Sequence, residues 1–449
     1  MDSGTQPGLR RLRPAQILVV SFLAIIGLGT LLLLLPWATA PGRQTSLVEA
    51  LFTATSAVCV TGLVVVDTST HWSRFGQVVI MMLIQAGGLG IMTTGTIFAL
   101  LTGRRIGLRE RLVIRESFGK DGFSGIVRLL QAIVLTTFLL EGLGAIYLAN
   151  RFAQDMPTWQ AWYYGVFHSV SAFCNAGFDL FGDSLVRYVS DPAVNFGFMT
   201  LIILGGLGFP VLVDVYRRVR RYDTRLSLHA RLVLVSTAVL LAAGTLAVLV
   251  FEHANPATLG SLGMRGRILS SLFHSVTPRT AGFNTLPTGQ LLPITLLVTM
   301  ALMFVGASPG GTGGGIKTTT FVTLLMGVKT PIAGRQEIEV FQKRIGKEIL
   351  EKSLAIAFLG MALVTFTTGF LLVSEGFEFL PVLFESISAF GTVGLSMGIT
   401  PGLTSAGRLM IIVTMFAGRV GPLTVFMAIA TRNRALAAYR RPEEKIMVG

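Results

Sequence analysis

The chain has 449 residues, of which 52% are hydrophobic and only 13% are charged, whereas soluble domains usually carry about a quarter charged residues. This composition excludes an ordinary soluble protein. The formal net charge of +14 would suit nucleic-acid binding if the basic residues followed one face, but they lie between apolar runs, so no nucleic-acid partner is expected. Cys59 and Cys174 lie in apolar surroundings and offer neither metal-ligand spacing nor a disulfide framework.

Eight apolar runs are long enough to cross a membrane, because a hydrocarbon core needs about 20 helical residues. In chain order they are 17–35, 75–101, 127–150, 193–216, 230–251, 291–327, 352–373 and 406–431. The first run follows a basic N-terminus as a secretory signal would, but a signal core is only roughly 7 to 15 residues long. Four shorter apolar stretches are typical of re-entrant or buried segments. They are 47–60, 160–174, 267–277 and 380–391.

The basic residues orient these segments. With the N-terminus in the cytoplasm, 27 of the 37 Lys and Arg residues lie on the inner side and eight lie outside, Arg279 among them. Because short loops rich in Lys and Arg stay on the cytoplasmic side, we predict a multi-pass protein of the inner (cytoplasmic) membrane with both termini in the cytoplasm. Lys317 and Arg419 fall within the bilayer. The positive surplus also favours contact with anionic membrane lipid.

One pattern recurs in each of the four shorter stretches. A phenylalanine is followed by a glycine ten residues later in three copies and nine residues later in the third copy, which contains a proline. The pairs are Phe52 and Gly62, Phe167 and Gly177, Phe273 and Gly282, and Phe384 and Gly394. The chain therefore divides into four similar units, each reading span, half-span, glycine turn and span.

This repeat predicts the fold class. We expect an all-α membrane protein in which eight transmembrane helices form four tandem M1-pore-M2 repeats around one pseudo-fourfold pore. The predicted units are 14–103, 125–218, 228–329 and 350–432, followed by a cytoplasmic C-terminal tail, 433–449.

The four glycine turns suggest a cation pathway. Non-helical backbone at membrane depth must be buried in protein or line water, and four such turns on one axis would offer rings of carbonyl oxygens that replace the hydration shell of a cation. The half-spans would direct their C-terminal ends, each worth about half a negative charge, toward the same cavity. Any one glycine would serve close helix packing equally well, whereas four copies in one context favour a pore.

The four turns resemble degenerate forms of the Thr-Val-Gly-Tyr-Gly filter of potassium channels. The candidate filter residues are Val60, Thr61, Gly62, Asn175, Ala176, Gly177, Thr280, Ala281, Gly282, Thr392, Val393 and Gly394. With them the whole chain resembles the Trk/Ktr/HKT superfamily of potassium transport subunits, and eight spans with a short N-terminus are most similar to the Ktr membrane subunit (KtrB). The resemblance implies potassium bound at the filter carbonyls. It also implies potassium selectivity, since plant relatives associated with sodium transport have serine where this chain has Gly62.

A glycine-rich segment, 306–315, interrupts the sixth apolar run, because neither a proline nor clustered glycines favour a continuous helix. It is not a phosphate loop, since Ile316 separates Gly315 from Lys317. In the family the corresponding break is an intramembrane gating loop under the filter. The resemblance thus implies gating residues Gly310, Gly311, Thr312, Gly313, Gly314, Gly315, Lys317 and Arg419.

Two charges near this loop have alternative interpretations. Arg419 lies in the last apolar run, where an arginine normally faces the bundle interior or water. In the family it lies against the gating loop, and the alternative is that it extends from near the helix end to the interface. Lys317 either faces the loop or extends toward the cytoplasm. His168 and His274 occupy matching places in two half-spans, which suits structural hydrogen bonds.

We therefore expect potassium uptake across the cytoplasmic membrane. The resemblance also implies stimulation by sodium, a homodimer with one pore per protomer, and a cytoplasmic ring of nucleotide-binding, KtrA-like regulatory subunits. The alternative is a secondary active transporter of another cation or small solute, whose inverted repeats would differ from four units that all begin and end inside. A non-conducting membrane scaffold would show no flux. No paired carboxylates or nucleophile–base pair stand out, so we do not expect an enzyme.

Overall fold

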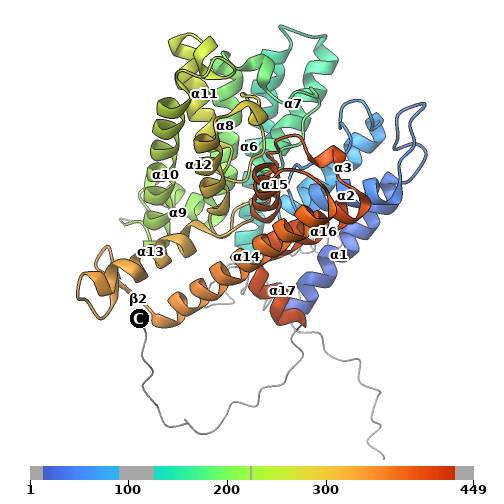
Figure 1. Cartoon of the computed structure of the whole chain (residues 1–449). Coiled ribbons are helices and arrows are strands. Elements are labelled where there is room, and N and C mark those ends of the chain that lie inside the picture. Colours follow the sequence, from blue (N-terminus) through green and yellow to red (C-terminus); the bar gives the residue numbers. More distant parts are fainter. Residues whose placement is uncertain (1–13, 91–125, 223–224, 430–449) are drawn as a thin grey trace, which may run out of the picture.

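The computed structural model describes residues 14–90, 126–222 and 225–429 and shows a bundle of helices (Figure 1). The predicted tail 433–449 and the ends of units 1, 2 and 4 at 91–103, 125 and 430–432 lie outside the described residues. The first two predicted units contain α1 (Pro14–Leu33), α2 (Leu47–Val58), α3 (Arg74–Gly88), α6 (Ile126–Phe152), α7 (Thr158–Phe173), α8 (Pro192–Leu207) and α9 (Phe209–Val219). The last two contain α10 (Leu228–Glu252), α11 (Met264–Val276), α12 (Pro293–Phe304), α13 (Thr318–Ile332), α14 (Lys347–Ser374), α15 (Phe379–Gly391), α16 (Ser405–Val420) and α17 (Pro422–Ile429).

A small hairpin is the one departure from helices among the described elements. β1 (Ile338–Val340) pairs antiparallel with β2 (Lys343–Ile345), and Ile338 lies opposite Ile345. The expectation of an all-α protein is therefore corrected at this one connection. Short 3-10 turns occur at Val186–Tyr188, Leu259–Ser261, Thr288–Gln290 and Thr400–Gly402.

The four half-spans are short helices, as the sequence predicts. They are α2, α7, α11 and α15, with 12, 16, 13 and 13 residues. Local signals set some boundaries: Ser46 and Glu49 form a reciprocal capping box at the start of α2, which satisfies two backbone donors that have no intrahelical partner. Ser73, Asp191 and Thr404 cap α3, α8 and α16 in a similar way through one side-chain acceptor each.

Two of the predicted crossing segments are each a pair of helices joined by a sharp bend. α8 and α9 meet at 101° across Gly208, and α16 and α17 meet at 98° across Gly421. Both glycines have positive φ values, 90° and 96°, and a proline follows within two residues of each, at Pro210 and Pro422. A glycine after a helix end and a proline in the next first turn is the usual signature of one helix stopping and another starting.

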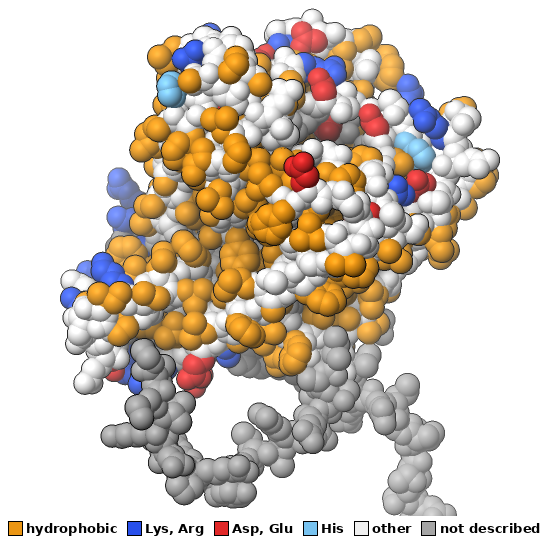
Figure 2. All heavy atoms as spheres, in the orientation of Figure 1, with side chains coloured by type: hydrophobic (Ala, Val, Ile, Leu, Met, Phe, Trp, Pro, Cys, Tyr) orange, Lys and Arg blue, Asp and Glu red, His pale blue; other side chains and the backbone are white. Residues whose placement is uncertain are grey.

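Length and composition let four described helices cross a membrane, or six segments if each bent pair is one span. The four are α1, α6, α10 and α14. Of the other two predicted crossings, 75–101 is described only to Gly90, and 291–327 is broken between α12 and α13. Large apolar side chains also cover the outside, for example Leu135 and Phe358, which are 71% and 70% exposed. Figure 2 shows apolar side chains across the middle of one face, with most charged side chains toward its upper and lower ends.

The short helices pack in a regular order. Within each predicted unit, the long helix packs against the short one: α1 on α2, α6 on α7, α10 on α11 and α14 on α15. Between units, the second helix packs against the short helix of the next unit: α3 on α7, α8 on α11, α12 on α15, and α16 back on α2. In Figure 1, α15 accordingly lies between α12 and α16. The order closes on itself, and this places the four glycine turns together.

Candidate functional site

The four turns share one unusual backbone geometry. The residue two places before each glycine is left-handed, with φ of 56° at Val60, 58° at Asn175, 75° at Thr280 and 50° at Thr392. The glycines Gly62, Gly177, Gly282 and Gly394 also have positive φ values, between 70° and 93°. A left-handed residue other than glycine is uncommon, and a β-branched one, as in three of these turns, is rarer still. Four turns that place a left-handed residue at the same position therefore have one common conformation.

The four glycines lie next to one another in chain order. A Cβ added to Gly62 would lie 2.5 Å from the carbonyl oxygen of Ala176, and one added to Gly177 would lie 2.9 Å from that of Ala281. A Cβ on Gly282 would meet the carbonyl of Val393, and one on Gly394 would meet that of Thr61, which closes the ring. No side chain larger than hydrogen fits without a shift, since real Cβ contacts under 3.0 Å are essentially absent.

Hydroxyl groups from the short helices hold each turn. Ser56 Oγ accepts from the N–H of Gly62 at 3.0 Å, and Ser388 Oγ accepts from the N–H of Gly394 at 3.1 Å. In the other two turns the hydroxyl donates to a carbonyl, from Ser171 to Phe178 at 2.8 Å and from Thr277 to Phe283. Sequence reasoning missed these four residues, although a Ser or Thr recurs six residues before the glycine, or five in the shorter third copy.

An acidic vestibule lies on one side of the ring. Its volume is about 480 Å³, and its lining includes all four glycines together with Asp67, Asp179 and Asp183. Asp179 accepts from the N–H groups of Phe181 and Gly182. Burial raises the pKa of the Asp179 carboxyl to about 6, and the nearby Asp67 and Asp183 act in the same direction. Carboxylates in a cleft raise the local concentration of cations.

The glycine-rich segment between α12 and α13 is an ordered loop tied to α8 and α9. It closes on itself through a 2.8 Å hydrogen bond from the N–H of Gly306 to the carbonyl of Ile316. The N–H groups of Ser308 and Thr312 donate to the carbonyls of Gly206 and Gly205 at 3.0 and 3.1 Å. In return, the N–H of Phe209 donates to the carbonyl of Gly310 at 3.0 Å. The bend at Gly208 therefore provides the backbone groups that hold the loop.

The loop touches the third and fourth turns. A Cβ on Gly313 would lie 2.9 Å from Thr280 Cβ, and one on Gly314 would lie 3.2 Å from Thr392 Cβ. Gly311 approaches the carbonyls of Gly205 and Gly206, and Gly315 approaches that of Gly391. Two of the predicted gating glycines, Gly313 and Gly314, thus lie directly against the left-handed residues of the third and fourth turns.

Arg419 and Lys317 both bind this loop. Arg419 donates from Nη1 to the carbonyl of Thr312 and from Nη2 to the carbonyl of Gly87 in α3. Lys317 Nζ donates to the carbonyls of Gly313, at 2.6 Å, and Gly314, at 3.4 Å. In this arrangement both side chains face the loop, and neither extends away from it toward the interface or the cytoplasm. Neither side chain makes an ion pair with another described residue.

Further residues support the ring from behind. Three glycines in second helices, Gly87, Gly205 and Gly418, lie against the carbonyl groups of Val58, Phe173 and Phe390, where a Cβ would not fit. His168 Nδ1 lies 2.8 Å from the carbonyl of Tyr164, and its Nε2 accepts from the N–H of Leu180 at 3.2 Å. His274 Nε2 lies 3.0 Å from Thr299 Oγ1. These are the structural hydrogen bonds expected of the two histidines.

The described residues contain no group of three or more His, Cys, Asp or Glu residues that could hold a metal ion.

Comparisons with known proteins agree on one family. The TrkH family, described as "Cation transport protein", matches residues 6–435. The chain is 41% identical to the Ktr system potassium uptake protein B of Bacillus subtilis, over 98% of this chain and 97% of that protein. It is 39% identical to the potassium/sodium uptake protein NtpJ of Enterococcus hirae, over 98% of each.

A solved structure has the same fold. The crystal structure of the potassium transporter TrkH from Vibrio parahaemolyticus superposes with a TM-score of 0.73 at 18% identity, covering 95% of this chain and 87% of that one. The family comprises transport proteins and not enzymes, and the apolar helices make the chain a membrane protein. On its residues and its fold, this chain belongs to the TrkH family of cation transport proteins.

Proposed function

We propose that the chain carries potassium into the cell through the ring formed by Gly62, Gly177, Gly282 and Gly394. The observation that carries the proposal is the closed contact of the four turns, in which each glycine lies against a carbonyl of the next turn. A potassium ion must lose its hydration shell to pass, and rings of carbonyl oxygens replace that shell. The acidic vestibule, lined by Asp67, Asp179 and Asp183, would concentrate cations before they enter.

The same proposal includes the fourfold architecture. Each second helix packs on the short helix of the next predicted unit, and α16 returns to α2. That cyclic order supports four tandem repeats and eight crossings around one axis. The C-terminal ends of the four short helices would then add partial negative charge near the ring.

The loop at 306–315 would gate the pathway. Gly313 and Gly314 lie against Thr280 and Thr392, so in this arrangement the loop covers one side of the ring. Arg419 joins the loop to α3 through two backbone carbonyls. Lys317, which follows the C-terminal end of the loop, donates back to the carbonyl of Gly313. Because the loop carries few side chains and several glycines, it can change its backbone conformation at low cost.

Orientation, sodium and partners complete the proposal. The bias of basic residues toward one side supports the inner (cytoplasmic) membrane with both termini inside. Sodium is named with potassium in the relative from Enterococcus hirae, which supports sodium as a second or stimulating ion. The proposal also includes a homodimer with a cytoplasmic, nucleotide-binding KtrA-like ring, which the resemblance to Ktr subunits implies; two relatives are named as parts of a Ktr system.

Uptake of radioactive rubidium into liposomes containing the purified protein tests the proposal. We expect uptake driven by the rubidium gradient alone, and a serine at Gly62 or Gly394 should lower the preference for potassium over sodium. An unchanged preference would refute the filter assignment. Uptake that requires an imposed gradient of a second ion would favour a secondary active transporter instead. Deleting several glycines from 310–315 should raise the flux, and an unchanged or lower flux would contradict the gate.

A further inference from the structure

One arginine lies where the other three turns have small, neutral side chains. The residue just before the left-handed position is Cys59 in the first turn, Cys174 in the second and Gly391 in the fourth. In the third turn it is Arg279, which is only 7% exposed. The charge count placed Arg279 with the other outer arginines, which a loop position would leave in water; in the structure its side chain is instead buried within the protein.

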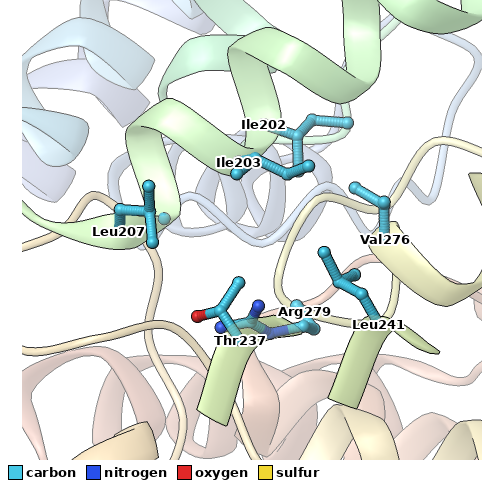
Figure 3. A pocket seen from close by; sticks show the side chains of 8 residues that line it. Ile202, Ile203, Leu207, Thr237, Leu241, Val276 and Arg279 are labelled. Atoms are coloured by element: carbon cyan, nitrogen blue, oxygen red, sulfur yellow. The ribbon is translucent and has the colours of Figure 1, made fainter. Parts of the chain in front are cut away.

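Arg279 faces a pocket between predicted units 2 and 3. The apolar part of the lining comes from Ile202, Ile203 and Leu207 of α8, Leu241 of α10 and Val276 of α11. Figure 3 shows Arg279 and Thr237 entering this space together, opposite Ile202 and Ile203. The pocket therefore has apolar walls and a single polar corner.

Both groups at that corner lack a partner among the described residues. Arg279 makes no ion pair or side-chain hydrogen bond there, and its Nε is buried without an acceptor. Thr237 Oγ1 is also buried without a partner. Another threonine of the same helix, Thr245, donates to the carbonyl four residues earlier, as helical threonines commonly do. Thr237 does not, so its hydroxyl is available to a ligand.

A buried guanidinium needs compensation. Arginine does not lose its proton in proteins, and a buried charge is normally paired or fully hydrogen-bonded. Among the described residues that line this pocket there is no carboxylate to supply the negative charge, and the buried Arg279 Nε and Thr237 Oγ1 both lack a hydrogen-bond partner. The ligand that satisfies them is therefore an anion, or a group with the same acceptor chemistry.

The size of the pocket selects among such ligands. Its volume is about 10 Å³, and a cavity needs roughly 10–15 Å³ on this measure to hold one water molecule. A lipid phosphate or a carboxylate-bearing molecule is too large. A single-atom anion, which is larger than water, requires Ile203 and Leu241 to move outward, and both of these side chains are partly exposed.

We propose that this pocket binds one small monovalent anion of the size of chloride, held between the Arg279 guanidinium and the Thr237 hydroxyl. The anion neutralises the only arginine that directly precedes one of the four turns in the ring. In a medium of low dielectric constant, an uncompensated charge this close to Thr280 repels a cation in the pathway. Its effect on transport rests on the proposed cation pathway, whereas binding of the anion does not.

Binding is tested first on the purified full-length protein. Radioactive chloride should bind at one site per chain, and bromide should displace it, whereas gluconate should not. Arg279→Gln should abolish binding. Thr237→Val keeps the shape of the side chain and should shift half-saturation to higher chloride concentration. Arg344→Gln, at an exposed arginine that pairs with Glu337 in the hairpin region, is the matched control and should bind as the wild type does.

Transport is tested second, with rubidium uptake into proteoliposomes that contain chloride or gluconate on both sides. The wild type and Arg344→Gln should lose rubidium flux severalfold in gluconate, and Arg279→Gln should have the same flux in both anions. Absence of bound chloride in the wild type, or chloride dependence that persists in Arg279→Gln, overturns the proposal. A requirement for anionic lipid in place of halide overturns it too, because it identifies a phosphate as the ligand. If chloride binding depends on Arg279 but no rubidium is taken up in either chloride or gluconate, the anion site is supported and the proposed potassium transport is refuted.

Discussion

Replacement of Gly313 by alanine tests whether the loop limits transport. The added Cβ would clash with Thr280 Oγ1 and lie 2.9 Å from Thr280 Cβ, whereas ordinary contact begins at 3.4 Å. The Thr280 hydroxyl must therefore turn away, and the loop must withdraw from Thr280 Cβ by about 0.5 Å to restore normal contact. Overpacking of a filled interior typically costs about 1 to 3 kcal/mol, and the part of this cost that comes from Thr280 applies only to the arrangement in which the loop lies against that residue.

The expected result is a higher flux. A destabilisation of about 1 to 3 kcal/mol changes an equilibrium by about 5- to 150-fold, here away from the covering loop. Initial rates of rubidium uptake into proteoliposomes, at equal protein content, measure the change. If the covering loop is the major state in the wild type, the rate should rise by up to that factor, until passage through the ring itself becomes limiting.

Gly369→Ala is the matched control. Gly369 lies in α14 with no atom within 4 Å of an added Cβ, so the same substitution adds no clash and should leave the flux unchanged. The reasoning is refuted if Gly313→Ala has the flux of Gly369→Ala while both proteins elute and unfold thermally like the wild type. A lower flux in Gly313→Ala alone would mean that the displaced loop blocks the pathway.

Three further variants test the site. Arg419→Gln loses charged hydrogen bonds to two carbonyls, worth about 1.5 to 3 kcal/mol each, and should raise rubidium flux. A flux at or below the wild-type level would contradict the proposal that Arg419 holds the loop against the ring. Ser388→Ala leaves the N–H of Gly394 without its acceptor, at a cost of about 1 to 3 kcal/mol, and should reduce the rubidium-to-sodium ratio in competition uptake; an unchanged ratio would show that the hydroxyl does not support selectivity. Burial raises the Asp179 pKa from 3.8 to about 6, so the carboxylate is charged only above that pH. Uptake at low potassium should therefore fall as the pH drops through about 6, and Asp179→Asn should remove that step. Because burial disfavours the charged form, Asp179 should also stabilise the fold most at low pH, and its contribution should decline between about pH 4 and 6.

The repeated pattern of Phe and Gly was enough to predict the ring. Spacing alone identified Gly62, Gly177, Gly282 and Gly394, because a glycine with positive φ is required at one point of each turn. The short helices were equally predictable, since apolar stretches of 11 to 15 residues are too short to cross a bilayer.

The bends and the buried arginine were not predictable in the same way. Hydropathy is averaged over a window of residues, so the apolar runs that contain Gly208 and Gly421 showed no break at these glycines. The nearby prolines were the one sequence signal of a bend. A count of basic residues treats every loop arginine as solvated, so it placed Arg279 outside. Only tertiary packing shows that Arg279 lies against α8 and α10. The contacts of Arg419 with Gly87 and Thr312 likewise join residues more than 100 positions apart.

Among the described residues, the loop that lies against Thr280 and Thr392 occurs in one of the four predicted units, and Arg419, which binds it, belongs to another. A pore assembled from four separate identical chains has to repeat every substitution around its axis, so one added arginine becomes four positive charges near the ions. Joining the units into a single chain removes that constraint. Each unit can then evolve separately: one contributes the loop, another contributes Arg419, which binds it, and all four keep their glycine turn.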